Sequence, residues 1–266
     1  MSARIRKGLA VVTGAGSGLG RALSLELIAR GVRVAGIGRR ADALQQTAEK
    51  AGHRFTPVPL DVSDFDAVQE AFQHLRTEIG PITLLINNAS VYPRRDFLDE
   101  TPESFMRSVS INLGGVVTCT HAALQDMIAV GAGRIMSVST FADLKPLPTA
   151  SAYSVSKGAA RIFTRALVAD LADRFPNIVV NDWVPGALAT EMGIPDGIDP
   201  AVAARWGATL ALWEDPSLTG TVFDRDCEQL LPRTLKRRLV DKALLRSAPK
   251  PRRLDSTESS ITRRSC

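Results

Sequence analysis

Two side chains with complementary acid–base chemistry, Tyr153 and Lys157, lie four residues apart in the chain. The segment from Ser151 to Arg174 has the composition of a helix, so both side chains are expected on one helical face. An ammonium group near a phenol favours the phenolate and lowers a pKa of about 10 toward neutrality. A tyrosine tuned in this way can act as a general acid or base. The alternative is an ordinary solvent-exposed helix face, where this spacing is also common.

A glycine-rich segment near the N-terminus has the composition of a phosphate-binding loop. Residues 13–20 read Thr-Gly-Ala-Gly-Ser-Gly-Leu-Gly and follow a short apolar run. Glycines let a backbone approach a pyrophosphate, and the N-terminus of the following helix attracts its charge. The spacing is T-G-x-x-x-G-x-G rather than the common G-x-G-x-x-G. Taken alone, this loop could also be a tight strand-to-helix turn without a ligand.

Two arginines follow the second apolar run and indicate which dinucleotide would bind. Gly38 occupies the position that usually carries an acid for the adenosine 2′-hydroxyl, and Arg39 and Arg40 come next. A guanidinium group can form charge-assisted bonds to a 2′-phosphate, which an acid would repel. The pattern therefore predicts NADP as the cofactor. The alternative places both arginines on a solvated turn.

Short apolar runs alternate with segments of helical period along the chain. Val68, Phe72, Leu75 and Ile79 have the spacing of one helix face, after a helix start at Ser63. Alternation of this kind requires parallel strands joined by right-handed crossovers. The sequence therefore predicts an α/β fold, a single Rossmann-like doubly wound parallel sheet of about seven strands with helices on both faces. The expected strands are Leu9–Val12, Val32–Ile37, Phe55–Leu60, Ile82–Ile86, Ile135–Val138, Ile178–Val184 and Thr221–Asp224.

Composition bounds the domain organisation and the partners. The chain has 266 residues, of which 45% are hydrophobic and 23% charged, as in a globular protein. We expect a catalytic domain at residues 1–229 and a basic extension at 230–266, helical over Leu230–Leu245 and disordered beyond. Eleven Lys or Arg residues against three acids lie in residues 232–266, without an aromatic residue to stack on a base. Only weak, non-specific nucleic-acid binding is therefore expected.

Other classes of site and location are disfavoured by simple counts. The three cysteines and three histidines are scattered, so no metal site is predicted, and Cys119 is interpreted as a small apolar helix residue. No apolar run reaches the roughly 18 residues that span a bilayer. The N-terminus lacks the apolar stretch of a signal peptide. No membrane partner and a cytoplasmic location are expected.

Several further motifs appear in a fixed order with the glycine loop and the Tyr153–Lys157 pair. They are Asn87-Asn88-Ala89 after the fourth strand, Asn112, Ser139-Thr140 after the fifth strand, and Pro185-Gly186 with Thr190 after the sixth. As a set, over roughly residues 8–222, they resemble the short-chain dehydrogenase/reductase family, of the type that prefers NADP. The resemblance implies a homotetramer or homodimer.

The family resemblance also implies roles for individual residues. Tyr153 would protonate a carbonyl oxygen on reduction, Lys157 would bind the nicotinamide ribose and tune Tyr153, and Asn112 would anchor a proton-relay water. Thr190 would hold the carboxamide, and Asp61 would contact the adenine. The implied catalytic residues are Asn112, Thr140, Tyr153 and Lys157. The implied cofactor-binding residues are Gly14, Ser17, Gly18, Leu19, Gly20, Arg39, Arg40, Asp61, Val62, Asn88, Ala89, Tyr153, Lys157, Pro185, Gly186 and Thr190, with Asn87 supporting the cofactor.

The sequence departs from the family pattern in three places. The serine that usually orients the substrate lies thirteen residues before the tyrosine, and Thr140 stands there, with Ser139 as the neighbouring alternative. The extra methyl group of threonine stiffens the side chain and narrows the pocket. Ser90 replaces the glycine of the Asn-Asn-Ala-Gly turn. Residues 224–227, Asp-Arg-Asp-Cys, replace the usual Asp-Gly-Gly.

The leading interpretation is an NADP(H)-dependent oxidoreductase acting on a small-to-medium apolar carbonyl or alcohol substrate. Arg94 and Arg95 are expected to face solvent, and the segment covering the substrate is expected to be short. An alternative is a catalytically weak cofactor-sensing or scaffold protein on the same fold. A third is binding of an acidic partner through the basic extension. Candidate pocket residues are Tyr92, Phe141, Leu188, Met192 and Trp206.

Overall fold

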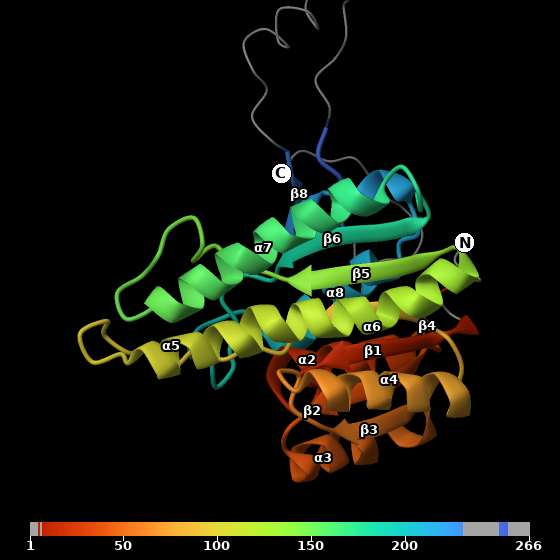
Figure 1. Ribbon diagram of the computed structural model, residues 1–266, viewed down its shortest axis with the longest axis horizontal. Helices are drawn as coiled ribbons and strands as arrows, with labels where there is room; N and C mark the ends of the chain where they lie inside the picture. Colours follow the sequence, from red (N-terminus) through yellow and green to blue (C-terminus); the bar gives the residue numbers. More distant parts are fainter. Residues whose placement is uncertain (1–4, 6, 231–249, 255–266) are drawn as a thin grey trace, which may run out of the picture.

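The computed structural model describes residues 5, 7–230 and 250–254, which form one sheet with helices on both faces (Figure 1). The strand order is β3-β2-β1-β4-β5-β6-β7-β8. Neighbouring strands from β3 to β7 are parallel, and β8 runs antiparallel to β7. The α/β doubly wound architecture is therefore confirmed. The strands are β1 Leu9–Thr13, β2 Arg33–Gly38, β3 Phe55–Pro59, β4 Ile82–Asn87, β5 Gly133–Val138, β6 Ile178–Val184, β7 Val222–Asp224 and β8 Cys227–Gln229.

The seven expected strands are present with shifts of one or two residues at their ends. The eighth, β8, was not expected, because its three residues carry no apolar run and it pairs only by folding back on β7. Residues of β1, β4 and β6 are buried throughout, as expected for strands covered on both faces.

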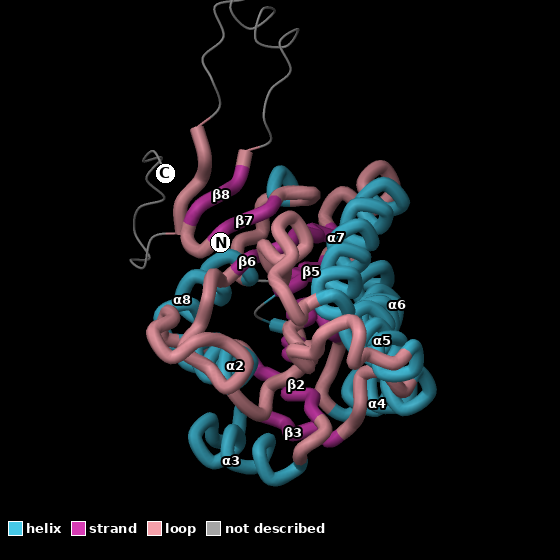
Figure 2. The backbone as a smooth tube through the Cα atoms, turned by 90° about the vertical axis from the view of Figure 1, so that its left-hand side faces the viewer, coloured by secondary structure: helices cyan, strands magenta, loops and turns pink. Residues whose placement is uncertain are grey.

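Two groups of helices sandwich the sheet, as Figure 2 shows from the side. One face carries α2 Gly18–Ala29, α3 Ala41–Ala51 and α8 Pro200–Ala211. The other carries α4 Phe65–Glu78, α5 Pro102–Val109, α6 Gly115–Val130 and α7 Ser151–Leu171. Short helical turns complete the described part: η1 Gly52–Arg54, the π-helical turn η2 Ser110–Gly114, and η3 Pro216–Leu218.

Helix α4 illustrates how local sequence sets an element. Asp64 caps its N-terminus, because the carboxylate accepts a hydrogen bond from the Ala67 N–H. Val68, Phe72 and Leu75 are then buried against the sheet at the expected helical spacing. The cap lies one residue after Ser63, the start expected from sequence.

The stretch Pro102–Val130, which joins α5, η2 and α6, has the length and mean hydropathy of a membrane-crossing helix. Half of its most apolar window is buried inside the fold, against β4, α4 and α7. A helix packed on a central sheet meets the same length and hydropathy criteria, so this feature is weak evidence for a membrane span.

The C-terminal residues 250–254 pack against the domain, so the expected disorder does not apply to these five residues. Arg253 forms an antiparallel bridge with Cys227 of β8, and the Leu254 N–H donates to the Asp226 carbonyl at 2.7 Å. The Leu254 side chain is 2% exposed and belongs to the core shared with α2 and α8. The expected helix over Leu230–Leu245 lies almost wholly outside the described residues.

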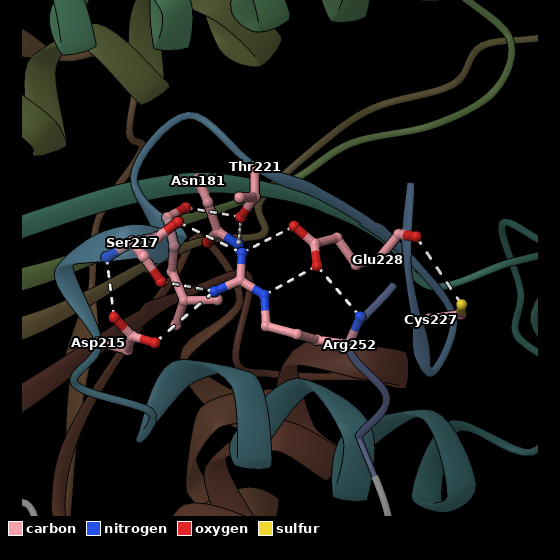
Figure 3. Close-up of polar contacts among 8 residues, drawn as sticks. Asn181, Asp215, Ser217, Thr221, Cys227, Glu228 and Arg252 are labelled. Carbon is pink, nitrogen blue, oxygen red and sulfur yellow. Dashed lines mark hydrogen bonds and ion pairs between the residues drawn. The ribbon is translucent and has the colours of Figure 1, made fainter. Parts of the chain in front are cut away.

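Arg252 anchors this segment through its guanidinium group, as drawn in Figure 3. Two of its nitrogens donate to the two carboxylate oxygens of Glu228, at 2.8 and 2.7 Å. A third nitrogen contacts Ser217 at 2.8 Å and Asp215 at 3.7 Å, and the group lies over the ring of Trp213. Bidentate charge-assisted contacts of this kind fix position as well as charge. Part of the basic charge of the extension is thus neutralised within the fold.

We expect the segment to contribute measurably to stability. A chain ending at Pro249 should melt about 3 to 12 °C below a chain ending at Leu254, measured by differential scanning calorimetry. Burying a leucine contributes about 1.5 to 3 kcal/mol, and each kcal/mol shifts Tm by about 2 to 4 °C at this size. Equal melting temperatures for the two chains would contradict the packing of residues 250–254.

Candidate active site

A cavity of about 1360 Å³ opens at the carboxyl ends of β1, β2, β4, β5 and β6. It lies at the point where the winding of the sheet reverses between β1 and β4, the usual ligand position in such folds. Most of the residues singled out from the sequence line it: Gly14, Ser17, Gly18, Leu19, Gly20, Arg39, Arg40, Asn88, Ala89, Thr140, Tyr153, Lys157, Pro185, Gly186 and Thr190. Asn112, Asp61 and Val62 do not.

The glycine loop forms a close backbone cradle between β1 and α2. Gly14 and Gly18 have φ values of 71° and 51°, in the left-handed region that favours glycine. A Cβ atom at Gly20 would lie 2.1 Å from the Gly14 carbonyl oxygen, so no larger residue fits there. Ser17 caps α2 without a side-chain hydrogen bond to the helix. The first N–H groups of α2 therefore remain available to an anion.

The two arginines after β2 lie at one end of the cavity. Arg40 donates to the Ser17 hydroxyl at 3.2 Å, next to the glycine loop. Arg39 lies 3.9 Å from Asp61, and half of its side chain is exposed. Asp61 thus pairs with Arg39 and accepts from the Ser63 N–H and hydroxyl instead of lining the cavity.

Tyr153 and Thr140 meet inside the cavity. Burial raises the pKa of Tyr153 above its usual value, a hydrogen bond with the Thr140 side chain opposes that shift, and nearby Tyr92 and Asp143 add to it. The Tyr92 and Tyr153 rings are stacked with centroids 4.5 Å apart. Of the two neighbouring hydroxyl groups, that of Thr140 is the one that influences the pKa of the phenol.

Lys157 lies in the same cavity, one helical turn after Tyr153, but its ammonium group has a different partner. Its Nζ donates to the Val138 carbonyl oxygen at 2.9 Å. Burial lowers the pKa of Lys157 to about 8, and Asp182 opposes this shift. The expectation that Lys157 lowers the pKa of Tyr153 is not met in this structure, because burial dominates and the ammonium is held by β5.

Asn112 is fully buried in the π-helical turn between α5 and α6 and lies outside the cavity wall. Its Oδ1 accepts from the Val91 N–H and the Ser90 hydroxyl, at 2.8 and 3.0 Å. Its Nδ2 donates to the Val91 carbonyl and the Ser156 hydroxyl, at 3.0 and 2.9 Å. Asn112 therefore ties the loop after β4 to helix α7. Ser90, a departure from the family pattern, supplies one of these bonds.

Four of the five residues expected to line the substrate pocket do line the cavity. Tyr92, Phe141, Leu188 and Met192 line the cavity, as expected. Trp206 does not, because it packs against the core between α8 and the sheet. Arg94 and Arg95 are exposed, as expected, and both also line the cavity.

A group of buried charges behind Tyr153 was missed by the sequence interpretation. Arg161 pairs with Asp143 through two contacts of 2.7 and 3.0 Å, and each side chain is 7% exposed. Asp182 on β6 accepts from the Thr164 hydroxyl at 3.0 Å. Lys157, Arg161 and Thr164 form one polar stripe on the face of α7 that meets the sheet. The available signal was Asp182 itself, a carboxylate that, with the neighbouring Asn181, interrupts an apolar strand run.

Within the described residues, no three His, Cys, Asp or Glu side chains lie close enough together to hold a metal ion. Cys119 is buried in α6, and burial raises its pKa to about 12, which agrees with its interpretation as a small apolar residue.

The known proteins that this chain resembles are dehydrogenases and reductases. A family model described as short chain dehydrogenase matches residues 8–199. L-xylulose reductase of Mesocricetus auratus is 35% identical over 193 residues, covering 72% of this chain and 76% of the relative. Carbonyl reductase (NADPH) 2 of Sus scrofa is 34% identical, covering 74% and 78%. The NADP-dependent (R)-specific alcohol dehydrogenase of Lentilactobacillus kefiri is 32% identical, covering 72% and 77%.

The buried carboxyl group of Asp182 should make stability depend on pH. Burial raises its pKa to about 7 in the folded chain, against 3.8 for an ordinary aspartate, although Thr164, Arg161 and Arg165 oppose the shift. Between these values the folded chain binds more protons than the unfolded chain, so stability falls as pH rises. The variant Asp182→Asn has no carboxyl group to ionise at this position, so it avoids this loss of stability at high pH. The Tm of the variant relative to wild type should therefore increase from about pH 5 to about pH 8, measured by calorimetry.

Asp170→Asn provides the matched control, because this aspartate lies exposed near the end of helix α7, which packs on β6. It should show no comparable gain at high pH. A Tm difference for Asp182→Asn that is constant across the pH range would mean that its carboxylate is charged throughout.

Proposed function

The chain belongs to the short-chain dehydrogenase family, and on that premise we propose that it transfers a hydride between NADP(H) and a small-to-medium carbonyl or alcohol substrate. One observation carries the proposal. Tyr153 and Thr140 line the same cavity as Lys157 and the glycine loop, and the Thr140 side chain influences the pKa of the Tyr153 phenol. An acid, a hydroxyl that orients it and a dinucleotide cradle are the parts that carbonyl reduction needs.

The residues of the cradle fit a dinucleotide. Close backbone approach at Gly14, Gly18 and Gly20, together with the uncapped N-terminus of α2, suits a pyrophosphate. Arg39 and Arg40 would then hold a 2′-phosphate at the end of β2. The names of two of the three relatives contain NADPH or NADP, which supports the same cofactor. When bound, the nicotinamide supplies or accepts the hydride.

The protonation state of Tyr153 favours reduction. Because its pKa is raised by burial, the phenol keeps its proton at neutral pH and can give it to a carbonyl oxygen. Thr140 is placed to orient both the phenol and that oxygen. Lys157 has three N–H donors, of which one goes to the Val138 carbonyl. The others would hold the nicotinamide ribose beside Tyr153.

The substrate end of the cavity is largely apolar. Phe141 and Met192 are partly exposed there, with Leu147, Leu188 and Ile194 beside them. Side chains of this kind suit the hydrocarbon part of a substrate. The relatives, named as reductases of carbonyls and of a sugar and as an alcohol dehydrogenase, support a carbonyl or alcohol substrate.

The remaining expectations from the sequence stay predictions. No described feature favours the alternative of a cofactor-sensing protein without turnover, since Thr140, Tyr153 and Lys157 lie together. The cytoplasmic location and the homo-oligomer rest on the sequence interpretation alone.

Tyr153→Phe tests the proposed function. General acid catalysis contributes about 10² to 10⁴ in rate, so kcat for carbonyl reduction should fall by at least that factor. The rate is read from NADPH absorbance with a panel of carbonyl compounds. NADPH affinity, measured by fluorescence titration, should stay within about threefold.

Tyr92→Phe is the matched control, because Tyr92 is the other tyrosine of the chain and stacks on the first. It loses the same hydroxyl group one ring away, and its effect on kcat should be far smaller. Comparable kcat in Tyr153→Phe and wild type would rule out this residue as the acid.

Coenzyme choice is tested at Gly38 and Arg39. A Cβ at Gly38 would meet only Leu44, at 3.6 Å or more, so an aspartate fits there. Gly38→Asp with Arg39→Leu should weaken NADPH binding by roughly 1.5 to 3 kcal/mol and shift preference toward NADH. Lys50→Leu, an exposed cation of α3 outside the cavity, controls for net charge. Equal affinity of the wild type for the two coenzymes would show that Arg39 is a surface residue.

A further inference from the structure

Arg94 occupies a strained position at the substrate end of the cavity. It lies in the loop after β4 and has a φ of 46°, in the left-handed region that a residue with a side chain seldom adopts. Strain of this kind persists only where surrounding contacts impose it, and it is concentrated at functional sites. The contacts of Arg94 therefore call for an explanation.

Three contacts hold the guanidinium group in one place. Its Nη2 donates to the carbonyl oxygens of Met192 and Gly193, at 3.0 and 2.8 Å. Its central carbon lies over the Tyr92 ring, 5.3 Å from the centroid. These contacts join the loop after β4 to the loop after β6 across the cavity mouth, and they fix the position of the charge before any substrate binds.

The charge of Arg94 has no carboxylate partner within the described residues. Two other arginines that line the cavity differ, because Arg95 pairs with Glu100 at 2.9 Å and Arg39 lies 3.9 Å from Asp61. Glu191 is the one acid among the described residues that line the cavity, and no ion pair joins it to Arg94. Nη2 uses two of the five N–H donors of the guanidinium group, and no described hydrogen bond uses the other three.

The guanidinium group also lies close to the reacting centre. Tyr92 contacts Arg94 and stacks on Tyr153, the proposed acid. A substrate whose carbonyl oxygen lies at Tyr153 would therefore extend past Tyr92 toward Arg94. The apolar side chains of Met192 and Ile194 lie in the same wall and suit the carbon chain between the two ends.

We propose that Arg94 forms an anion subsite and that the substrate carries a carboxylate a few carbons away from its reacting carbonyl. One uncompensated guanidinium balances one negative charge, so a carboxylate fits better than a dianionic phosphate. The inference rests on the proposed function for the position of the carbonyl. It adds a second recognition point, so the substrate class becomes keto acids and hydroxy acids with an apolar middle.

Arg94 also joins the loop after β4 to the loop after β6. If this structural role were its only one, its loss would affect charged and uncharged substrates equally. The test therefore compares two forms of one compound, levulinate and its uncharged methyl ester, together with the next two longer keto acids and their esters. Wild type should show a higher kcat/KM for at least one acid than for its ester. In Arg94→Gln this acid-to-ester ratio should fall about 10- to 100-fold, the effect of losing a charge-assisted hydrogen bond.

Two further variants sharpen the comparison. Arg94→Lys keeps the charge, so the ratio should return part of the way to the wild-type value. Arg95→Gln removes a neighbouring guanidinium that is already paired with Glu100, so the ratio should not change. A ratio that falls equally in Arg95→Gln and Arg94→Gln would assign the effect to the general positive field and overturn the subsite.

Binding is measured separately, by titrating each keto acid into the wild-type chain and into Arg94→Gln in a calorimeter. If wild type reduces the esters but Arg94→Gln changes neither the ratio nor the Kd, the subsite is wrong and the proposed function stands. If neither form is reduced with NADPH or NADH but binding depends on Arg94, the proposed function is wrong and the anion subsite stands. If no acid in the series binds in an Arg94-dependent way, the inference is overturned.

Discussion

The Thr13 hydroxyl joins the two halves of the sheet at the point where the chain reverses its winding. It accepts hydrogen bonds from the Asn88 and Ala89 N–H groups, both at 2.9 Å, while the Asn88 side chain donates to the Thr13 carbonyl. These bonds hold the glycine loop after β1 at a fixed separation from the loop after β4. The first loop belongs to the proposed cofactor cradle and the second carries Tyr92 and Arg94, so the cofactor and substrate ends share one rigid frame.

Buried charges lie on the side of that frame that carries Tyr153, and such charges are unfavourable in a core. Lys157, Arg161, Asp143 and Asp182 are all buried behind Tyr153, where desolvation penalises each charge. Replacing such groups by apolar side chains is often neutral or stabilising. Their presence next to the Tyr153 phenol is consistent with a site that keeps buried charges although they lower the stability of the fold.

Two arginines show how the same side chain serves different ends. Arg252 is bound bidentately by Glu228, so its charge is compensated and it fastens the C-terminal segment to the sheet edge. Arg94 is held as firmly, but by carbonyl oxygens and an aromatic ring that leave its charge without a carboxylate partner among the described residues. The first arrangement stabilises the fold, whereas the second presents a positive charge to the cavity.

The sequence alone determined which residues could take part in the site: the glycine loop, Arg39, Tyr153 and Lys157 follow from residue type and spacing. Apolar periodicity and parallel crossovers place the ends of successive strands at one edge of the sheet, so these residues were expected near one another. The sequence could not decide what side chains touch across that edge. Four features depend on contacts between residues far apart in the chain. They are the influence of Thr140 on Tyr153, the hydrogen bond from Lys157 to Val138, the burial of Leu254, and the bonds that hold Arg94 at the cavity. Such contacts exist only once the sheet and its loops have packed, and no local pattern encodes them.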